Sequence, residues 1–203
     1  MTHYSITVLE IGYGENVPQG FYLGDFADPD VTYPVHPFSM TLLQGEGKNI
    51  LIDTGIDMDD PVKQQIIAGA GIGHTQTPAK ILETVGLKPE DIDAVILTHA
   101  HFDHIGAVNE LKSMYSVPVY ISAADVPMLE DPALNMGMTS VMLQDDDIRL
   151  EGGEKIKICG MTFEVISTPG HTPGGICFYI EDAHILFAGD TMFRYSWGRT
   201  DFP

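Results

Sequence analysis

The segment ILTHAHFDHIG, residues 96–106, places three histidines and an aspartate directly after an apolar run. In an extended segment alternate side chains point the same way, so His99 and His101 are expected to direct two imidazoles at one point. Asp103 and His104 follow in the turn and offer a carboxylate and a third imidazole to a neighbouring point. Borderline divalent metals favour these ligands, and strand ends are common positions for sites in α/β folds. The segment therefore predicts a metal site at the end of a buried strand.

Two later segments supply matching residues. The turn TPGHTPGG, residues 168–175, contains His171 among glycines and prolines that permit close backbone approach. The segment ILFAGD, residues 185–190, is an apolar strand that ends at Asp190, which repeats the order of a strand followed by a ligand. Each segment alone is weak evidence, but together with the histidine-rich segment they indicate a metal centre.

These segments carry a family resemblance. LIDTG at 51–55, THAHFDH at 98–104, PGHTPGG at 169–175 and FAGD at 187–190 resemble the metallo-β-lactamase-fold hydrolases, and the resemblance extends over nearly the whole chain. It implies an α/β fold, the αββα sandwich, in which two mixed sheets are flanked by helices. We therefore expect a single domain over residues 1–203, with the metals at one edge of the two sheets.

The resemblance also implies two divalent metal ions and a ligand set. Zinc is the expected metal, with iron or manganese as alternatives for a site of imidazoles and carboxylates. The implied ligands are His99, His101 and His171 for one ion, Asp103 and His104 for the other, and Asp190 as the bridge. Asp53 matches a position that orients a ligand without touching the metal.

The chemistry expected of such a centre is hydrolysis. Two metal ions about 3.5–4 Å apart lower the pKa of a bridging water towards neutrality, and the metal-bound hydroxide attacks a carbonyl carbon. Asp103 is the expected catalytic residue, which orients the hydroxide and carries a proton to the leaving group. The sequence has no GxSxG motif that would indicate a serine nucleophile. We expect the substrate to be a small-molecule ester, thioester or lactone.

The chain departs from the family in one ligand. Dinuclear members use a further histidine well after the bridging aspartate, whereas the thirteen residues that follow Asp190 include none. We expect that the chain is truncated at its C-terminus and that the last part of the fold is missing. The alternatives are that another segment supplies the ligand, that the second ion is held weakly, or that the domain binds metal but is inactive.

A mononuclear iron enzyme is the alternative hypothesis for the reaction. His99, His171 and Asp190 alone would form the two-histidine, one-carboxylate triad of non-haem iron oxygenases. Persulfide dioxygenases of the same superfamily use these positions, and GRTDFP at 198–203 is similar to their corresponding segment. This hypothesis would make the chain an oxidoreductase.

The resemblance divides along the chain where the substrate is concerned. The N-terminal part, which includes GLKPEDIDAVILTHAHFDHIG at 86–106, looks like N-acyl homoserine lactonases, whereas residues 143–203 are closer to glyoxalase II-like thioesterases. Lactonases of this kind have a tyrosine where the chain has Phe193, so Tyr195 and Tyr22 are the alternatives for polarising a lactone carbonyl. These three aromatic residues are the predicted substrate-pocket positions.

Hydrophobic periodicity predicts the elements that carry these motifs. Helices are expected at 77–86, 106–115 and 123–131, the first with Thr77 as N-cap. A long loop is expected at 13–37, which is rich in glycine, proline and aspartate. The expected strands are 4–12, 38–44, 49–55, 93–98, 117–122, 155–160, 161–168, 175–181 and 184–190.

Composition excludes some classes of partner. The chain has 10 lysines and arginines against 29 aspartates and glutamates, a net charge of −19, which repels phosphate backbones. We therefore expect no nucleic-acid partner. No window approaches the ~18 apolar residues of a membrane span, and no segment resembles a signal peptide. We expect a cytoplasmic protein that acts on a small molecule; oligomeric state has no signature in the sequence.

Overall fold

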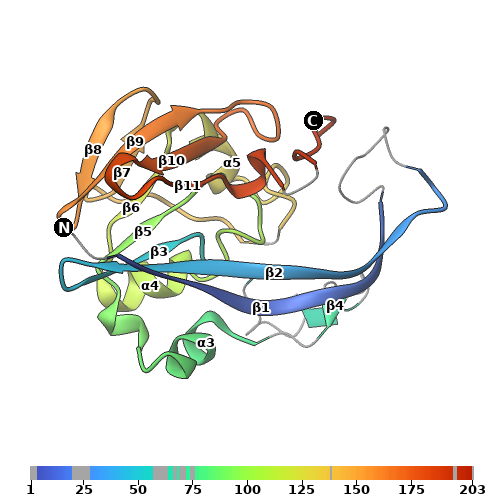
Figure 1. Cartoon of the computed structure of the whole chain (residues 1–203), viewed down its shortest axis with the longest axis horizontal. Helices are drawn as coiled ribbons and strands as arrows, with labels where there is room; N and C mark the ends of the chain where they lie inside the picture. Colours follow the sequence, from blue (N-terminus) through green and yellow to red (C-terminus); the bar gives the residue numbers. More distant parts are fainter. Residues whose placement is uncertain are drawn as a thin grey trace.

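The computed structural model of the chain describes residues 4–19, 28–56, 64–65, 68, 72–73, 76–137, 139–193 and 196–202. Two β-sheets lie face to face, and helices pack on the outer face of the larger sheet (Figure 1). The larger sheet has the strand order β4-β1-β2-β3-β5-β6-β7, and the smaller has the order β11-β10-β9-β8. The predicted fold class, a sandwich of two sheets with flanking helices, is confirmed.

The strands of the larger sheet are β1 (Ser5–Pro18), β2 (Thr32–Gly45), β3 (Lys48–Ile52), β4 (Ile72–Gly73), β5 (Ala94–Ile96), β6 (Val119–Ser122) and β7 (Ile148–Leu150). Those of the smaller sheet are β8 (Lys155–Ile158), β9 (Met161–Ser167), β10 (Ile176–Ile180) and β11 (Ile185–Phe187). The helices are α3 (Pro78–Thr84), α4 (Val108–Tyr115) and α5 (Val126–Glu130), with short 3-10 turns η2 (Pro89–Asp91), η3 (Ala123–Asp125), η4 (Glu181–Ala183) and η5 (Gly189–Thr191). Each strand and helix expected from periodicity is present at its predicted position. Among the described residues, no helix has the length and apolar character needed to cross a membrane.

Two apolar clusters hold these layers together. The cluster between the sheets includes Ile96 of β5 and Phe178 of β10, both 0% exposed. The cluster on the other face of the larger sheet includes Leu82 of α3, Leu111 of α4 and Leu129 of α5. Burial of each large apolar side chain contributes roughly 1.5–3 kcal/mol, which offsets the conformational entropy lost on folding. The loops that leave the sheets therefore start from well-packed strands.

The predicted loop at 13–37 is wrong over part of its length. Strand β1 continues to Pro18 and pairs there with Thr32, the first residue of β2. The two strands form a long arm beyond the rest of the larger sheet (Figure 1). Strand β3 pairs with β2 only over residues 41–45, so among the described strands the part of β2 that contains Pro34 and Pro37 pairs with β1 alone. The proline content of residues 13–37 suggested a loop, but these residues include the ends of two strands that pair with each other.

The loops that carry the sequence motifs leave both sheets at one edge. Strands β3, β5 and β6 run parallel, so their carboxyl ends point the same way. Asp53 follows β3 and His99 lies just beyond β5, and the two loops are joined where Asp53 N donates to Ile96 O at 2.8 Å. The smaller sheet brings the β9–β10 turn with His171, and Asp190 after β11, to the same place. The residues predicted to bind metal thus meet between the two sheets.

Candidate metal centre

Three imidazoles from both sheets form the first group of candidate ligands, which we call cluster A. The ligand nitrogens of His99, His101 and His171 all lie within 4.8 Å of one another. His101 Nδ1 is 3.0 Å from His171 Nε2. Two nitrogens bound to one tetrahedral zinc at about 2.0–2.1 Å are themselves about 3.3 Å apart. The spacing therefore fits one metal ion held by the three imidazoles.

Contacts behind two of these rings orient them. Thr98 Oγ1 donates to Asp53 Oδ2 at 2.8 Å and lies 3.2 Å from His99 Nδ1. Because the hydroxyl proton is engaged by Asp53, the hydroxyl oxygen accepts from His99 Nδ1, which leaves His99 Nε2 as a lone-pair donor to metal. His171 Nδ1 lies 2.9 Å from the backbone carbonyl of Arg199, and donation to this carbonyl has the same effect. In both rings Nε2 is therefore the nitrogen that can bind a metal ion in cluster A.

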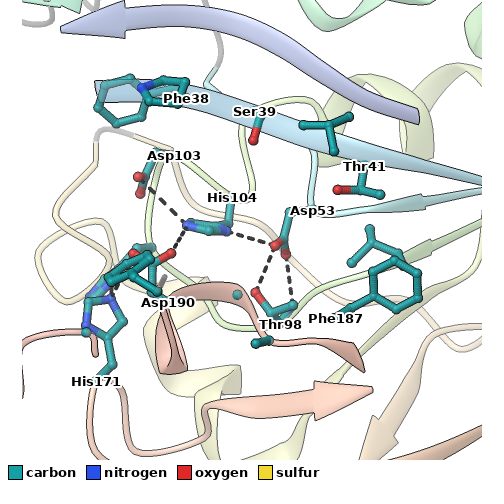
Figure 2. A pocket seen from close by; sticks show the side chains of 18 of the residues that line it. Phe38, Ser39, Thr41, Asp53, Thr98, Asp103, His104, His171, Phe187 and Asp190 are labelled. Carbon is teal, nitrogen blue, oxygen red and sulfur yellow. Dashed lines mark hydrogen bonds and ion pairs between the residues drawn. The ribbon is translucent and has the colours of Figure 1, made fainter. Parts of the chain in front are cut away.

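The second group of candidate ligands, cluster B, consists of His99, His104 and Asp190. His104 Nε2 lies 3.4 Å from Asp190 Oδ1, and His171 Nε2 lies 3.5 Å from Asp190 Oδ2 (Figure 2). The two oxygens of one carboxylate therefore face different clusters. Asp103 approaches the same site, with its Oδ2 3.8 Å from His104 Nε2. The structure brings together all six side chains that the sequence predicted as ligands.

Asp53 contacts residues of both clusters from behind. Its carboxylate accepts from Thr98 N and Thr98 Oγ1, each at 2.8 Å, and its Oδ2 lies 2.9 Å from His104 Nδ1 (Figure 2). Through Thr98 it also acts on His99. The Asp53 backbone has a φ of 57°, a left-handed conformation that few non-glycine residues adopt. Asp53 therefore has the contacts of a residue that orients ligands, and it is absent from both clusters.

A buried nitrogen atom without a hydrogen-bond partner tests whether a metal ion fits this site. His99 Nε2 is buried and has no hydrogen-bond partner among the described residues, whereas His101 directs its Nδ1 towards His171 Nε2. Leaving such an atom unpaired costs about 1–3 kcal/mol. Burial lowers the pKa of His99 well below its ordinary value, and burial together with His171 and His104 lowers the pKa of His101 to about 3. Both imidazoles are therefore neutral at pH 7, which is the form that binds metal, so the donor set fits a divalent ion.

Cluster B is governed by charge. Burial by itself lowers the pKa of His104, but the carboxylates of Asp53, Asp103 and Asp190 outweigh it and hold that pKa well above its ordinary value. Burial raises the pKa of Asp103, against the opposing effect of His104. For Asp190 burial acts in the same direction, but His104 and other histidines overcome it and hold the pKa of Asp190 well below its ordinary range. These acids therefore surround a region that favours positive charge.

The members of both clusters other than His99 line a pocket of about 850 Å³. Phe193, predicted as a substrate-pocket residue, is part of its lining. The other two predicted pocket residues, Tyr22 and Tyr195, lie outside the described residues. Apolar or uncharged side chains from β1, β2 and β11 extend the lining away from the clusters: Ile6, Val8, Thr41, Ile185, Leu186 and Phe187.

Sequence reasoning missed three contributors to the site. The ring of Phe202 packs edge-on at 5.1 Å from the His101 ring and 5.3 Å from the His171 ring. Gly198 has no room for a side chain, because a Cβ there would lie 1.9 Å from Asp190 O. Asp125 hydrogen-bonds both segments that carry cluster A. The one signal for Asp125 in the sequence is its position shortly after a predicted strand, which resembles the position of Asp53 after β3.

A family model confirms the resemblance. Residues 34–203 match the model described as the Metallo-beta-lactamase superfamily. The chain belongs to this superfamily. It is 39% identical over 112 residues to the probable metallo-hydrolase YqgX of Bacillus subtilis, covering 53% of each protein. It is 35% identical over 119 residues to the hydroxyacylglutathione hydrolase GloC of Haemophilus influenzae, covering 56% of each.

The matched part spans about half the length of these two superfamily relatives. An uncharacterized Aquifex aeolicus protein is 34% identical over 158 residues, which cover 76% of the chain and 72% of the relative. The B3 metallo-beta-lactamase BLEG-1 superposes with a TM-score of 0.60 at 30% identity, covering 81% of the chain and 72% of that structure. TTHA1623 in a di-iron-bound form superposes with a TM-score of 0.57 at 32% identity, covering 83% and 75%. The fold is therefore shared with a solved metallo-beta-lactamase and with a solved protein in a di-iron-bound form.

Proposed function

We propose that the chain is a metal-dependent hydrolase that cleaves a small ester, thioester or lactone, with two divalent metal ions, zinc first among the candidates. The observation that carries the proposal is the position of Asp190, whose two oxygens face His171 of cluster A and His104 of cluster B. A carboxylate placed in this way suits a bridge between two adjacent ions. Neutral imidazoles on one side and acids on the other suit ligands for both.

The proposed roles follow the contacts. Cluster A holds one ion and cluster B, with Asp103, contributes to the other. Asp53 orients the ligands from behind through Thr98 and His104. When bound, the ions would supply a hydroxide nucleophile at neutral pH and polarise the substrate carbonyl.

Asp103 is the proposed proton carrier. Its carboxyl group lines the pocket and lies beside His104, and burial favours its protonated form. A carboxyl group in this position can orient the nucleophile and then deliver a proton to the leaving group oxygen or sulfur. No serine or cysteine nucleophile is required by this scheme.

The pocket lining supports a substrate with an apolar substituent. Strand β11 contributes Ile185 and Phe187, and strand β1 contributes Ile6 and Val8. An acyl group of moderate size can lie along these side chains while its carbonyl group reaches the two ligand clusters. Phe193 lines the same pocket and adds apolar surface rather than a hydroxyl group. A small molecule is therefore the proposed partner.

The names of two relatives favour hydrolysis over oxidation. YqgX is described as a probable metallo-hydrolase and GloC as a hydroxyacylglutathione hydrolase, and a hydroxyacylglutathione is a thioester. A thioester is accordingly the first substrate class to test. The alternative, a mononuclear iron oxygenase that uses His99, His171 and Asp190, has the same residues within reach and is an outcome of the same experiment.

The test combines metal analysis with a substrate panel. Purified protein is analysed for zinc, iron and manganese, and hydrolysis is then measured with an acyl-glutathione thioester, an N-acyl homoserine lactone, an aryl ester and a β-lactam. We expect up to two ions per chain, hydrolysis of a thioester, ester or lactone, and loss of activity on chelation that zinc restores. Iron as the sole metal, with oxygen uptake on a persulfide and no hydrolysis, would overturn the proposal. Bound metal without turnover of any of these substrates would also count against it.

A further inference from the structure

Asp125 is a buried acid that belongs to neither ligand cluster. It is the last residue of η3, directly after β6, and it is 0% exposed. Within the described residues it forms no ion pair with a lysine or arginine. A buried carboxylate is expensive unless its oxygens are paired, so its hydrogen-bond partners indicate what keeps it in place.

Three hydrogen-bond donors point at this carboxylate. Ala100 N donates to Asp125 Oδ2 at 3.1 Å, and Thr172 Oγ1 donates to the same oxygen at 2.8 Å. Gly174 N donates to Asp125 Oδ1 at 2.6 Å. Burial raises the pKa of Asp125, and these three hydrogen bonds oppose the rise by favouring the ionised form.

The donors belong to the two segments that carry cluster A. Ala100 lies between His99 and His101 in the loop after β5. Thr172 follows His171 directly in the turn between β9 and β10. One carboxylate therefore links a loop of the larger sheet to a turn of the smaller sheet, at the residues next to the three imidazoles.

The contact between the turn and η3 is close. A Cβ placed on Gly174 would lie 2.5 Å from Asp125 N and 2.8 Å from Asp125 Oδ1. Glycine is therefore needed at 174 for proximity, and any outward movement of the turn would break its hydrogen bond to Asp125. These contacts fix the distance between the turn that carries His171 and the loop that carries His99 and His101.

We propose that Asp125 is a positioning residue that sets the distance between the His99–His101 pair and His171, and thereby the affinity and geometry of the metal site in cluster A. This role rests on the proposed metal-dependent function. Asp125 is absent from both ligand clusters and from the pocket lining, so it would act through Ala100, Thr172 and Gly174. A group behind a ligand typically changes metal affinity by roughly 10–100-fold when it is removed.

Two variants test the role. Asp125→Asn keeps the shape but presents an amide N–H₂ towards at least one of the three donors, so at least one of these donors loses its acceptor. Thr172→Val removes one hydrogen bond and leaves the carboxylate in place. If Asp125→Asn fails to fold, Thr172→Val still tests the proposal.

Asp147 provides a matched control. It is a buried acid that accepts from Val119 N at 2.9 Å and Gln144 N at 2.6 Å and pairs with Lys112, so Asp147→Asn also damages a buried carboxylate network. It is absent from the pocket lining and from both clusters. Its substitution should lower stability without changing the metal site.

Three readouts are compared at a temperature at which every variant is folded. They are the zinc dissociation constant from competition with a chromophoric chelator, the visible spectrum of the cobalt(II)-substituted protein, and amide hydrogen exchange of the metal-free protein. We expect Asp125→Asn to weaken zinc binding roughly 10–100-fold, to change the cobalt bands, and to expose Ala100 and Gly174 amides to exchange. Thr172→Val should change these readouts in the same direction by less. Asp147→Asn should lower the melting temperature and leave the zinc affinity and cobalt bands unchanged.

The outcomes separate this inference from the proposed function. If wild-type protein binds neither zinc nor cobalt, the proposed function fails and the positioning role fails with it. If wild-type protein binds metal but Asp125→Asn or, where that variant does not fold, Thr172→Val has wild-type affinity and cobalt bands, only the positioning role is overturned. An equal change in Asp147→Asn would also overturn it, because general destabilisation would then account for the effect.

Discussion

Clusters A and B differ in what holds their side chains in place, although His99 is common to both. In cluster A the imidazoles of His99 and His101 are buried and have lowered pKa values, and hydroxyl or backbone groups behind His99 and His171 set the direction of each ring. In cluster B acids surround His104 and hold its pKa well above the ordinary value. One site is therefore organised by hydrogen bonds before any metal binds, and the other by charges that a metal ion would balance. Cluster A should bind the first metal ion, and cluster B should depend more strongly on its acids.

Removing a ligand from cluster A should have the largest effect. His101→Ala leaves two imidazoles of this cluster, so we expect loss of its metal ion and a fall in hydrolysis that exceeds the roughly 10–100-fold typical of removing a group behind a ligand. Zinc stoichiometry and activity measure both. His184→Asn is the matched control, since His184 is exposed, lies outside the pocket lining and has a φ of 55° that asparagine tolerates. Unchanged zinc content in His101→Ala would refute the assignment of cluster A.

Changing an acid beside cluster B should have the next largest effect. Asp103→Asn keeps the shape but removes the proton carrier and one proposed ligand, so kcat should fall roughly 100–10,000-fold. The zinc ion of cluster A should remain, because Asp103 is not part of that group. Steady-state kinetics together with metal analysis distinguish the two effects. Loss of all metal in this variant would contradict the expectation that cluster A holds its ion without Asp103.

The clusters should also respond to pH in opposite ways in the metal-free protein. The folded-state pKa of His101, about 3, lies below the unfolded value of 6.5, so the unfolded chain binds more protons between these values and His101 lowers stability as pH falls through this window. His104 has a raised folded-state pKa, so its contribution is fully present below pH 6.5 and is lost as pH rises through that pKa. A tenfold difference between the acid dissociation constants of the folded and unfolded states corresponds to about 1.4 kcal/mol of unfolding free energy.

Chemical denaturation of metal-free protein between pH 3 and pH 7 tests whether His101 lowers the unfolding free energy as pH falls. We expect that His101→Ala loses less stability than wild type as pH falls through roughly 6.5 to 3. A steeper acid loss in the variant would show that His101 is protonated in the folded protein. That result would also contradict its place among neutral ligands.

The smallest effect is expected from the aromatic ring against cluster A. Phe202→Leu keeps an apolar side chain but removes the edge-on contacts with His101 and His171, which should cost about 0.5–1.5 kcal/mol. Thermal unfolding should shift by about 2–4 °C, with metal content unchanged. Trp197→Leu is the control, because Trp197 is 66% exposed. A fall in metal content in Phe202→Leu would contradict this expectation and would show that the ring also holds the ligand histidines in place.

Local sequence patterns predicted most of the secondary structure, and the reason is visible in particular elements. Thr77 accepts from Lys80 N at 3.3 Å and Gly86 has a φ of 76°, as the N-cap and the end of helix α3 require. The arm formed by β1 and β2 was missed in part because strand pairing between Pro18 and Thr32 depends on residues distant along the chain. Its prolines carry a loop signal, and the part of β2 that contains them pairs with β1 alone among the described strands.

The sequence by itself determined the superfamily and the ligand types, because His99, His101, Asp103 and His104 are neighbours in one short segment. Only the tertiary structure decided how His171 and Asp190 meet them, with the two oxygens of Asp190 facing different clusters. It alone revealed the position of Asp125 between the two sheets. Spacing along a strand is set by local backbone geometry, whereas the distance between two sheets is set by packing and by hydrogen bonds between residues far apart in the chain.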